Sequence, residues 1–219
     1  MIKLSNRLQL VASFTPDNSN IIDVGCDHAL LSIYLYQTLK NVKILATDIN
    51  QNPLEGAKLN LKKYRLEDKI KLEIKDGINN LDKNIDTIII SGMGGILISK
   101  ILNNRESLKN IKTIILSPNN DFPVVRKTLK KLGFSIKEEK LLTEKKITYL
   151  VLKAIKGKEK RVNYFFGTLD NKDLETIYYY TKILNTNTNI LKSLPKKYIF
   201  KKIKLKSENK KIKKFLEKE

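Results

Sequence analysis

The pattern of apolar and polar residues predicts an alternation of strands and helices over the first 155 residues of the 219-residue chain. Short apolar runs alternate with stretches in which apolar residues recur three or four apart, as Val125, Leu129 and Leu132 do. Such an alternation favours an α/β fold with a parallel, doubly wound sheet. The expected strands cover residues 21–25, 42–47, 70–74, 85–91, 111–116, 134–141 and 147–155. The expected helices cover residues 4–14, 28–39, 53–64, 96–103 and 124–132.

The C-terminal part of the chain breaks this alternation. No helical stretch separates the last two expected strands, so the sheet is predicted to end in an antiparallel hairpin. Beyond a polar break at 157–160 the pattern becomes helical, with a seven-residue spacing that is typical of a coiled-coil seam. The residues at this spacing are Ile177, Leu184, Leu191, Tyr198, Leu205 and Ile212. Pro195 interrupts the seam, which predicts a helical hairpin, and we expect two domains at 1–160 and 161–219.

Lysine dominates the charge of the chain. There are 43 basic and 23 acidic residues, a formal net charge of +20, and eleven lysines lie between positions 196 and 218. A lysine-rich surface attracts polyanions through counterion release, which indicates a nucleic-acid partner. The abundance of Lys, Ile and Asn fits compositional drift equally well, so the sequence leaves both explanations of the excess open.

The single cysteine, Cys26, excludes an internal disulfide. No stretch approaches the roughly 18 consecutive apolar residues of a membrane span, and the N-terminal residues lack the apolar core of a secretion signal. We therefore expect a cytoplasmic protein with no membrane partner.

The most informative segment is the turn after the first strand, DVGCDHALL at 23–31. A dinucleotide-binding turn would need glycine at positions 25, 27 and 30, which are Gly25, Asp27 and Leu30 here, so that the backbone can approach a pyrophosphate. Only Gly25 is present, and a carboxylate at Asp27 repels phosphate. Such a turn suits a ligand that carries an ammonium and a sulfonium, as S-adenosylmethionine (SAM) does. An α/β domain that binds no ligand remains the alternative.

Aspartates end three successive expected strands. Asp23 could face the ammonium of SAM, Asp48 follows Gly25 by 23 residues, and Asp76 precedes Gly77. The spacing to Asp48 is close to the roughly 20 residues expected for a carboxylate that binds ribose hydroxyls. Each aspartate alone could be a helix cap or a turn residue. Three at the edge where ligands bind in open α/β sheets favour a binding site.

Two further loops follow the fourth and fifth strands. Three of the four residues in Gly92-Met93-Gly94-Gly95 are glycines, which permit a close approach of the backbone to a ligand. The Asn119 amide in Ser117-Pro118-Asn119-Asn120 can both donate to and accept from a base edge. Both loops are also ordinary turn sequences.

Five motifs together resemble one family: LSNRLQLVA, DVGCDHALLSIYL, TDINQNPLEGAK, ISGMGGILI and ILSPNND. With them the chain resembles, over nearly its whole length, the bacterial tRNA (adenine(22)-N1)-methyltransferase family. The resemblance implies a Rossmann-like class I methyltransferase domain with a seven-stranded, mostly parallel sheet, followed by a C-terminal helical hairpin. It also implies SAM as cofactor and tRNA as substrate.

The resemblance implies roles for the matching positions. Asp27 and Asn119 would be catalytic, Asp27 by stabilising the charge on the methylated base and Asn119 by orienting the base. The cofactor-binding residues would be Asp23, Gly25, Cys26, Asp48, Ile49, Asp76, Gly77 and Gly92. The substrate-binding residues would be Arg7, His28, Met93, Gly94, Pro118 and Arg126. No metal ligand is expected.

Several alternatives stay open at this point. His28, the only histidine, is either a general base or a residue that fixes the loop. Cys26 stands where the family commonly has serine, and Ser117 where it often has glutamine; ring-nitrogen methylation needs no thiol nucleophile. The rival functions are a SAM-dependent methyltransferase for another RNA, a protein or a small molecule, and a non-enzymatic nucleic-acid-binding protein.

Overall fold

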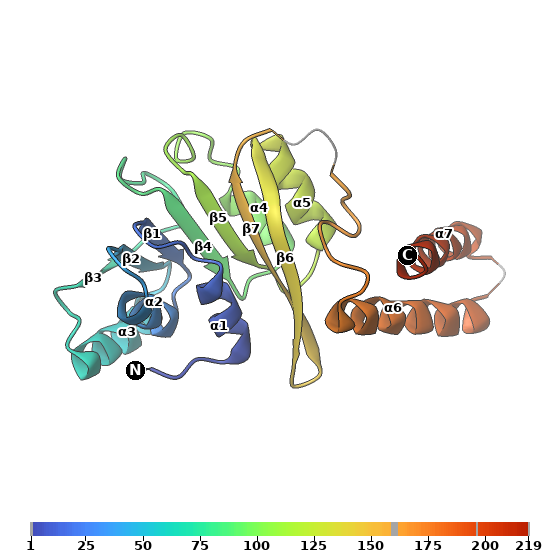
Figure 1. Cartoon of the computed structure of the whole chain (residues 1–219), viewed down its shortest axis with the longest axis horizontal. Helices are drawn as coiled ribbons and strands as arrows, with labels where there is room; N and C mark the ends of the chain where they lie inside the picture. Colours follow the sequence, from blue (N-terminus) through green and yellow to red (C-terminus); the bar gives the residue numbers. More distant parts are fainter. Residues whose placement is uncertain (1, 159–161, 196, 219) are drawn as a thin grey trace. The chain divides into compact units, whose positions relative to one another are not determined.

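The seven expected strands form one sheet with the order β3-β2-β1-β4-β5-β7-β6 (Figure 1). The computed structural model describes residues 2–158, 162–195 and 197–218. The strands are β1 (Asn20–Val24), β2 (Lys43–Asp48), β3 (Ile70–Ile74), β4 (Thr87–Ser91), β5 (Thr113–Ser117), β6 (Phe134–Glu144) and β7 (Ile147–Lys156). The helices of this part are α1 (Asn6–Ser13), α2 (Leu30–Thr38), α3 (Gln51–Tyr64), α4 (Gly95–Ile101) and α5 (Phe122–Lys131). The predicted fold class is confirmed.

Strand pairing creates a crevice at one edge of the sheet. The pairs β1–β2, β2–β3, β1–β4 and β4–β5 are parallel, and β7 is antiparallel to both β5 and β6. The chain runs outward from β1 to β3 and then returns to β4 on the other side of β1. Ligands bind in open α/β sheets where the strand order reverses, at the carboxyl ends of the strands. Here that position lies between β1 and β4.

The central strands each carry a run of apolar residues, because a parallel strand is covered on both faces. Fully buried side chains in them are Ile21, Ile22, Ile88, Ile89, Ile90, Ile114, Ile115 and Leu116. Three of the strands carry a polar residue at or near the carboxyl end: Asp23 in β1, Asp48 in β2 and Ser91 in β4. The core therefore fixes the strands and leaves these polar residues at the crevice.

The chain divides into two compact units, one up to Thr168 and one from Leu169 to Glu219. The sequence placed the boundary at residue 160, and 159–161 lie outside the described residues. The segment before Thr168 belongs to the first unit because buried charges hold it there. Glu139 Oε2 accepts from the Thr168 amide at 2.6 Å, and Arg126 Nη1 donates to the Phe165 carbonyl at 2.8 Å.

The second unit contains the predicted helical hairpin, α6 (Leu174–Ser193) and α7 (Ile199–Leu216), with Pro195 between the helices. Asp173 caps α6 by accepting from the Thr176 amide at 2.9 Å. The packed face of α6 differs from the predicted seam: Ile177 is 37% exposed, whereas Thr176, Tyr180 and Asn187 are buried. Tyr180 and Phe215 pack edge to face at 5.4 Å. On α7 the predicted seam residues Leu205 and Ile212 are buried.

A search of the described helices for a span long and apolar enough to cross a membrane finds none.

Candidate active site

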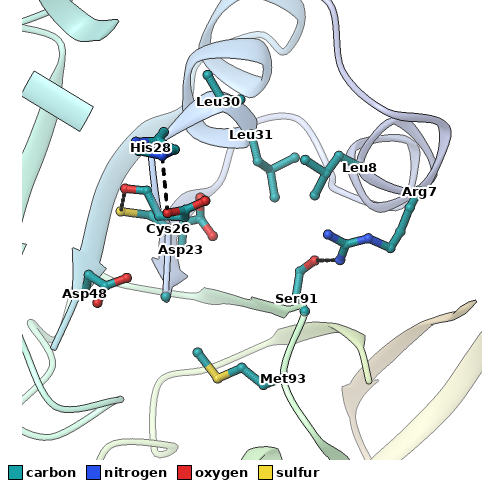
Figure 2. Close-up of a pocket in the computed structure, with 13 residues that line it drawn as sticks. Arg7, Leu8, Asp23, Cys26, His28, Leu30, Leu31, Asp48, Ser91 and Met93 are labelled. Atoms are coloured by element: carbon teal, nitrogen blue, oxygen red, sulfur yellow. Dashed lines mark hydrogen bonds and ion pairs between the residues drawn. The ribbon is translucent and has the colours of Figure 1, made fainter. Parts of the chain in front are cut away.

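A cavity of about 400 Å³ opens at the carboxyl ends of β1, β2 and β4 (Figure 2). Residues from α1, from the turn after β1 and from the loop after β4 surround it. They are Arg7, Leu8, Asp23, Gly25, Cys26, Asp27, His28, Leu30, Leu31, Asp48, Ser91, Gly92 and Met93. Nine residues predicted from the sequence as site residues are therefore brought together around one cavity: Arg7, Asp23, Gly25, Cys26, Asp27, His28, Asp48, Gly92 and Met93.

Asp23 supplies a buried carboxylate to this cavity. Its side chain is 3% exposed, and the Ser32 hydroxyl of α2 donates to its Oδ2 at 2.7 Å. Burial disfavours the charged form and raises the pKa of Asp23 to about 6, although the bond from Ser32 acts in the opposite direction. Asp23 is therefore poised to ionise fully when a cationic group enters the cavity.

The turn after β1 is held in an unusual backbone conformation. Gly25 has φ +72°, and the non-glycine residues Asp27 and Ala29 also have positive φ, at +52° and +55°. Left-handed conformations cost energy for residues with a Cβ and tend to persist at functional sites. The amides of Gly25 and Cys26 both donate to the Thr47 carbonyl, at 2.8 and 2.9 Å. The turn is thus anchored to β2.

Helix α3 supports the same turn from outside the cavity. Asn60 Nδ2 donates to the His28 carbonyl at 3.0 Å. The His28 ring lies over Gly56, where an added Cβ would come within 2.3 Å of Nδ1. His28 Nε2 lies 3.7 Å from Asp27 Oδ1. This packing favours the loop-fixing interpretation of His28, because α3 holds both its ring and its carbonyl.

The loops after β4 and β5 are bonded to each other. Asn119 Nδ2 donates to the Gly92 carbonyl at 2.7 Å, and the backbone N–H of Asn119 donates to the Met93 carbonyl at 2.9 Å. Asn120 Oδ1 accepts from the Gly95 amide at 3.0 Å. These bonds fix the Met93 backbone and the orientation of the Asn119 side-chain amide.

Arg7 provides the cationic side chain of the cavity lining. Its Nη1 donates to Ser91 Oγ at 2.6 Å, and its guanidinium lies 5.2 Å from the centre of the Tyr149 ring. Figure 2 shows Arg7 across the cavity from His28 and Asp48. Both partners of the guanidinium are neutral, so its charge is available to an anionic group of a ligand.

Seven predicted site residues, Asn119 and Arg126 among them, lie outside the lining of this cavity. Asp76 and Gly77 line a second cavity of about 280 Å³ together with Leu97 and Ile101. Ile49 is 61% exposed, and Pro118 is buried. Gly94 is the N-cap residue of α4. Their roles stay predictions, as does the catalytic role of Asn119, which is exposed at the loop described above.

The structure contradicts the substrate-binding role expected for Arg126. Its side chain is fully buried, and its Nε donates to Glu139 Oε1 at 2.8 Å. Its Nη1 donates to the carbonyls of Tyr164 and Phe165, at 3.1 and 2.8 Å. A guanidinium enclosed in this way cannot contact a bound RNA, so Arg126 is a structural residue that anchors the segment before Thr168.

Sequence reasoning missed four residues of the cavity lining: Leu8, Leu30, Leu31 and Ser91. Ser91 could have been found, because it is the polar residue that follows three successive isoleucines at the end of β4. The three leucines carry no such signal, since leucines on helices are usually core residues. Ser32, the partner of Asp23, also carries no signal, because a single serine among the apolar residues of α2 does not indicate which group it bonds.

The chemistry of the remaining groups limits what the cavity can do. Burial, together with the nearby carboxylates, raises the pKa of the Cys26 thiol, which makes it a poor nucleophile. Within the described ranges, no three or more His, Cys, Asp and Glu side chains are grouped so that they could hold a metal ion. The cavity is instead an acidic, partly buried pocket with one cationic wall.

Comparison with known proteins places this geometry in context. Residues 4–152 match the family described as the methyltransferase domain. A tRNA (adenine(22)-N(1))-methyltransferase of Bacillus subtilis is 35% identical over 158 residues, and the match covers 71% of this chain and 66% of that protein. The chain thus spans about two thirds of the length of this relative.

Solved structures match over almost the full chain. The crystal structure of the B. subtilis M1A22 tRNA methyltransferase TrmK has a TM-score of 0.88 at 26% identity, and the match covers 99% of this chain and 100% of that one. Mycoplasma capricolum TrmK in complex with S-adenosylhomocysteine (SAH) has a TM-score of 0.88 at 29% identity, with 97% of each chain covered.

Proposed function

The chain belongs to the bacterial tRNA (adenine(22)-N1)-methyltransferase family, and on this premise we propose that it transfers a methyl group from SAM to N1 of adenine 22 in tRNA. The observation that carries the proposal is the acidic cavity at the strand-order reversal, in a chain whose relative of known structure binds SAH. As a tRNA-modifying enzyme, it would work in the cytoplasm.

The cavity residues fit the charge of this cofactor. Asp23, Asp27 and Asp48 line one cavity, and the positive charges of SAM are its ammonium and its sulfonium. Asp23 would accept the ammonium, and the positive φ of Gly25 lets the turn come close to the ligand. Asp48, at the end of β2, would accept hydrogen bonds from ribose hydroxyls.

The second cavity would complete the cofactor site. Asp76 follows β3, the next strand after β2, and a carboxylate there can accept from the amino group of adenine. Leu97 and Ile101 would supply apolar contacts to a planar base. Ile49 lies next to Asp48 and would contact the nucleoside from the β2 side.

The proposed reaction is a direct transfer in which the chain mainly orients the reactants. Adenine N1 would supply the electron pair for the new bond to the methyl group of SAM, the sulfur–methyl bond would break, and SAH would leave as the neutral thioether. Asn119 Oδ1 would accept from the adenine amino group, because its Nδ2 is already committed to the Gly92 carbonyl. Asp27, whose side chain is 74% exposed at the cavity mouth, would stabilise the positive charge that methylation leaves on the base.

A base must leave its stack to reach such a pocket, which costs a few kcal/mol and requires a firm hold on the RNA. Arg7 would contact the anionic part of a ligand at the cavity wall. The lysines of α7 would hold the tRNA backbone through phosphate contacts, which carry affinity rather than sequence choice.

Incubation of the purified protein with labelled SAM and unmodified tRNA, followed by mapping of the modified nucleotide, tests the proposal. We expect 1-methyladenosine at position 22. Label in a different nucleotide, in protein or in a small molecule would favour another methyltransferase class. An absence of SAM binding by calorimetry would favour a non-enzymatic RNA-binding protein.

A further inference from the structure

The N-terminal end of α7, including its N-cap residue, carries a cluster of exposed apolar side chains. Phe200 is 89% exposed, Ile199 60%, Ile203 59% and Tyr198 47%. We call these four residues the apolar patch. Apolar surface left in water is unfavourable, and a clustered patch marks an interaction site more often than a single exposed residue does.

Three residues of the apolar patch, Ile199, Phe200 and Ile203, lie on the outer face of α7, whereas Tyr198 is the N-cap residue that precedes the helix. Leu205 and Ile212 are buried and define the packed face. At 3.6 residues per turn, Phe200 lies about 140° around the helix from Leu205, and Ile203 about 160°. These side chains therefore cannot join the hairpin seam without a change in the register of α7.

Lysines continue the same outer face. By the same helix geometry, Lys204, Lys211 and Lys214 lie within about 40° of the Phe200 direction, and all three are exposed. With a rise of 1.5 Å per residue, Lys204 lies about 6 Å and Lys211 about 16 Å along the axis from Phe200. The whole of α7 carries eight lysines and a single acidic residue, Glu208.

We propose that the apolar patch binds an unstacked base of an RNA loop while the lysines of the same face hold the adjoining phosphates. This inference rests on the proposed function, which supplies an RNA substrate. An exposed aromatic ring beside a cationic track is the arrangement that binds single-stranded nucleic acid, because every base has a face that can stack. The patch adds affinity for an open loop and does not select a particular base.

The charge of α7 disfavours the other occupants of an exposed apolar patch. A second copy of the chain packed through this face would bring its own lysines close to these lysines, and like charges repel. A helix that lies on a membrane needs apolar residues along one whole side. The apolar patch instead ends at Ile203, and lysines take over the face beyond it.

A tryptophan reporter tests the contact directly, because the chain contains no tryptophan. In the full chain carrying Phe200→Trp, unmodified tRNA should quench the indole emission by stacking and should protect the indole from acrylamide. The matched control is Leu174→Trp. Leu174 is 81% exposed at the start of α6, but it lies between Asp173 and Glu175, where phosphates are repelled. Its emission should not respond to tRNA.

Affinity measurements separate stacking from charge. Phe200→Ala should weaken tRNA binding about tenfold, as expected for the loss of one base–aromatic stack, whereas Phe200→Tyr should bind like the wild type. The slope of log affinity against log salt should be the same in Phe200→Ala, because no phosphate contact is lost. The double variant Lys204→Ala/Lys211→Ala should reduce that slope by about two.

Three results would overturn the inference. The first is an unquenched indole in the Phe200→Trp variant combined with a Phe200→Ala affinity within twofold of wild type. The second is an emission shift caused by phosphatidylglycerol vesicles but not by tRNA. The third is an emission shift that follows protein concentration alone, with a dimer in sedimentation. Methyl transfer by the wild-type protein is measured in parallel. If the wild type transfers no methyl group to tRNA, the proposed function is wrong. If transfer is normal but the Phe200 variants bind tRNA like the wild type, only the RNA-binding role of the apolar patch is wrong.

Discussion

The cavity of the first unit and the outer face of α7 in the second unit hold their charges in opposite ways. The cavity carboxylates come from strand ends and a turn that hydrogen bonds fix, and Asp23 is 3% exposed. The lysines of α7 are exposed along a helix and repeat at many equivalent positions. The function of a cavity carboxylate therefore depends on its exact position, whereas the affinity of α7 for an anion depends on how many lysines it carries.

This difference predicts two kinds of response to mutation. A buried or position-fixed charge has no substitute when it is removed, so single changes in the cavity should be large. Each phosphate contact on an exposed helix is one of many, so single lysine changes should be small and should appear in the salt dependence.

Asp27→Ala should lower the rate of methyl transfer by at least about a hundredfold, which is the scale for removing one electrostatic stabiliser. SAH affinity should stay within a few-fold of wild type, because Asp27 lies at the exposed mouth of the cavity. Single-turnover kinetics and calorimetry measure the two quantities. A near-normal transfer rate would remove the catalytic role of Asp27.

Asp48→Ala should weaken cofactor binding by roughly tenfold to a hundredfold, because the loss of a carboxylate bonded to ribose hydroxyls costs about 1–3 kcal/mol. Circular dichroism should show a folded protein, since the Asp48 side chain makes only a local bond, Oδ1 to the Asn50 amide at 3.0 Å. Unchanged SAH affinity in titration calorimetry would mean that the end of β2 does not bind the cofactor.

The raised pKa of Asp23, about 6, predicts opposite pH dependences for binding and stability. Only the carboxylate pairs with an ammonium, so SAH affinity should rise about tenfold from pH 5 to pH 8 through this pKa. Without ligand, the folded protein binds a proton that the unfolded chain has lost between pH 4 and 6, so stability should fall as the pH rises through that window.

Asp23→Asn is the control for both pH profiles, because an amide of the same shape does not titrate. Its SAH affinity should be low and nearly independent of pH. If the wild type and Asp23→Asn show the same pH profile, another group controls the cofactor site.

Gly56→Ala tests the support of the turn from α3, and we expect a loss of roughly threefold to tenfold in methyl transfer. The new Cβ would lie 2.3 Å from His28 Nδ1, so the ring must move and carry the turn with it. Alanine favours helix over glycine by about 1 kcal/mol, so the Tm should not fall. The small expected loss reflects the exposure of His28, whose side chain is 55% accessible and can shift.

The double variant Gly56→Ala/His28→Ala checks the direction of this effect. Without the His28 ring the alanine has nothing to displace, so the double variant should transfer at the rate of His28→Ala alone. If Gly56→Ala lowers methyl transfer by the same factor in the wild type and in His28→Ala, then Gly56 acts through a residue other than His28.

The sheet and much of the cavity could be predicted because buried parallel strands leave a clear apolar pattern. Asp23 and Asp48 stand out as charges at the ends of such runs, and the reversal of strand order brings those ends together. The cavity therefore follows from the sequence as far as it depends on local pattern and topology.

The wrong assignments depend on long-range packing. Arg126 follows the loop after β5 in sequence, yet Glu139 on β6 and the carbonyls at 164–165 enclose it. The heptad spacing through Ile177 predicted a seam that the structure shifts by one residue, because Thr176 and Tyr180 pack inward instead. The residues near Arg126 in sequence do not reveal its bonding partners. The residues near Ile177 likewise do not reveal which face of α6 is packed.

The most direct test of the proposed methyl transfer compares two tRNAs that differ in a single base. One carries adenine at position 22 and the other guanine there, with the same sequence elsewhere. We expect the full chain to incorporate one labelled methyl group, mapped to N1 of adenine 22, in the first tRNA and none in the second. Equal incorporation into both tRNAs, or label at another nucleotide, would contradict the proposed methyl transfer.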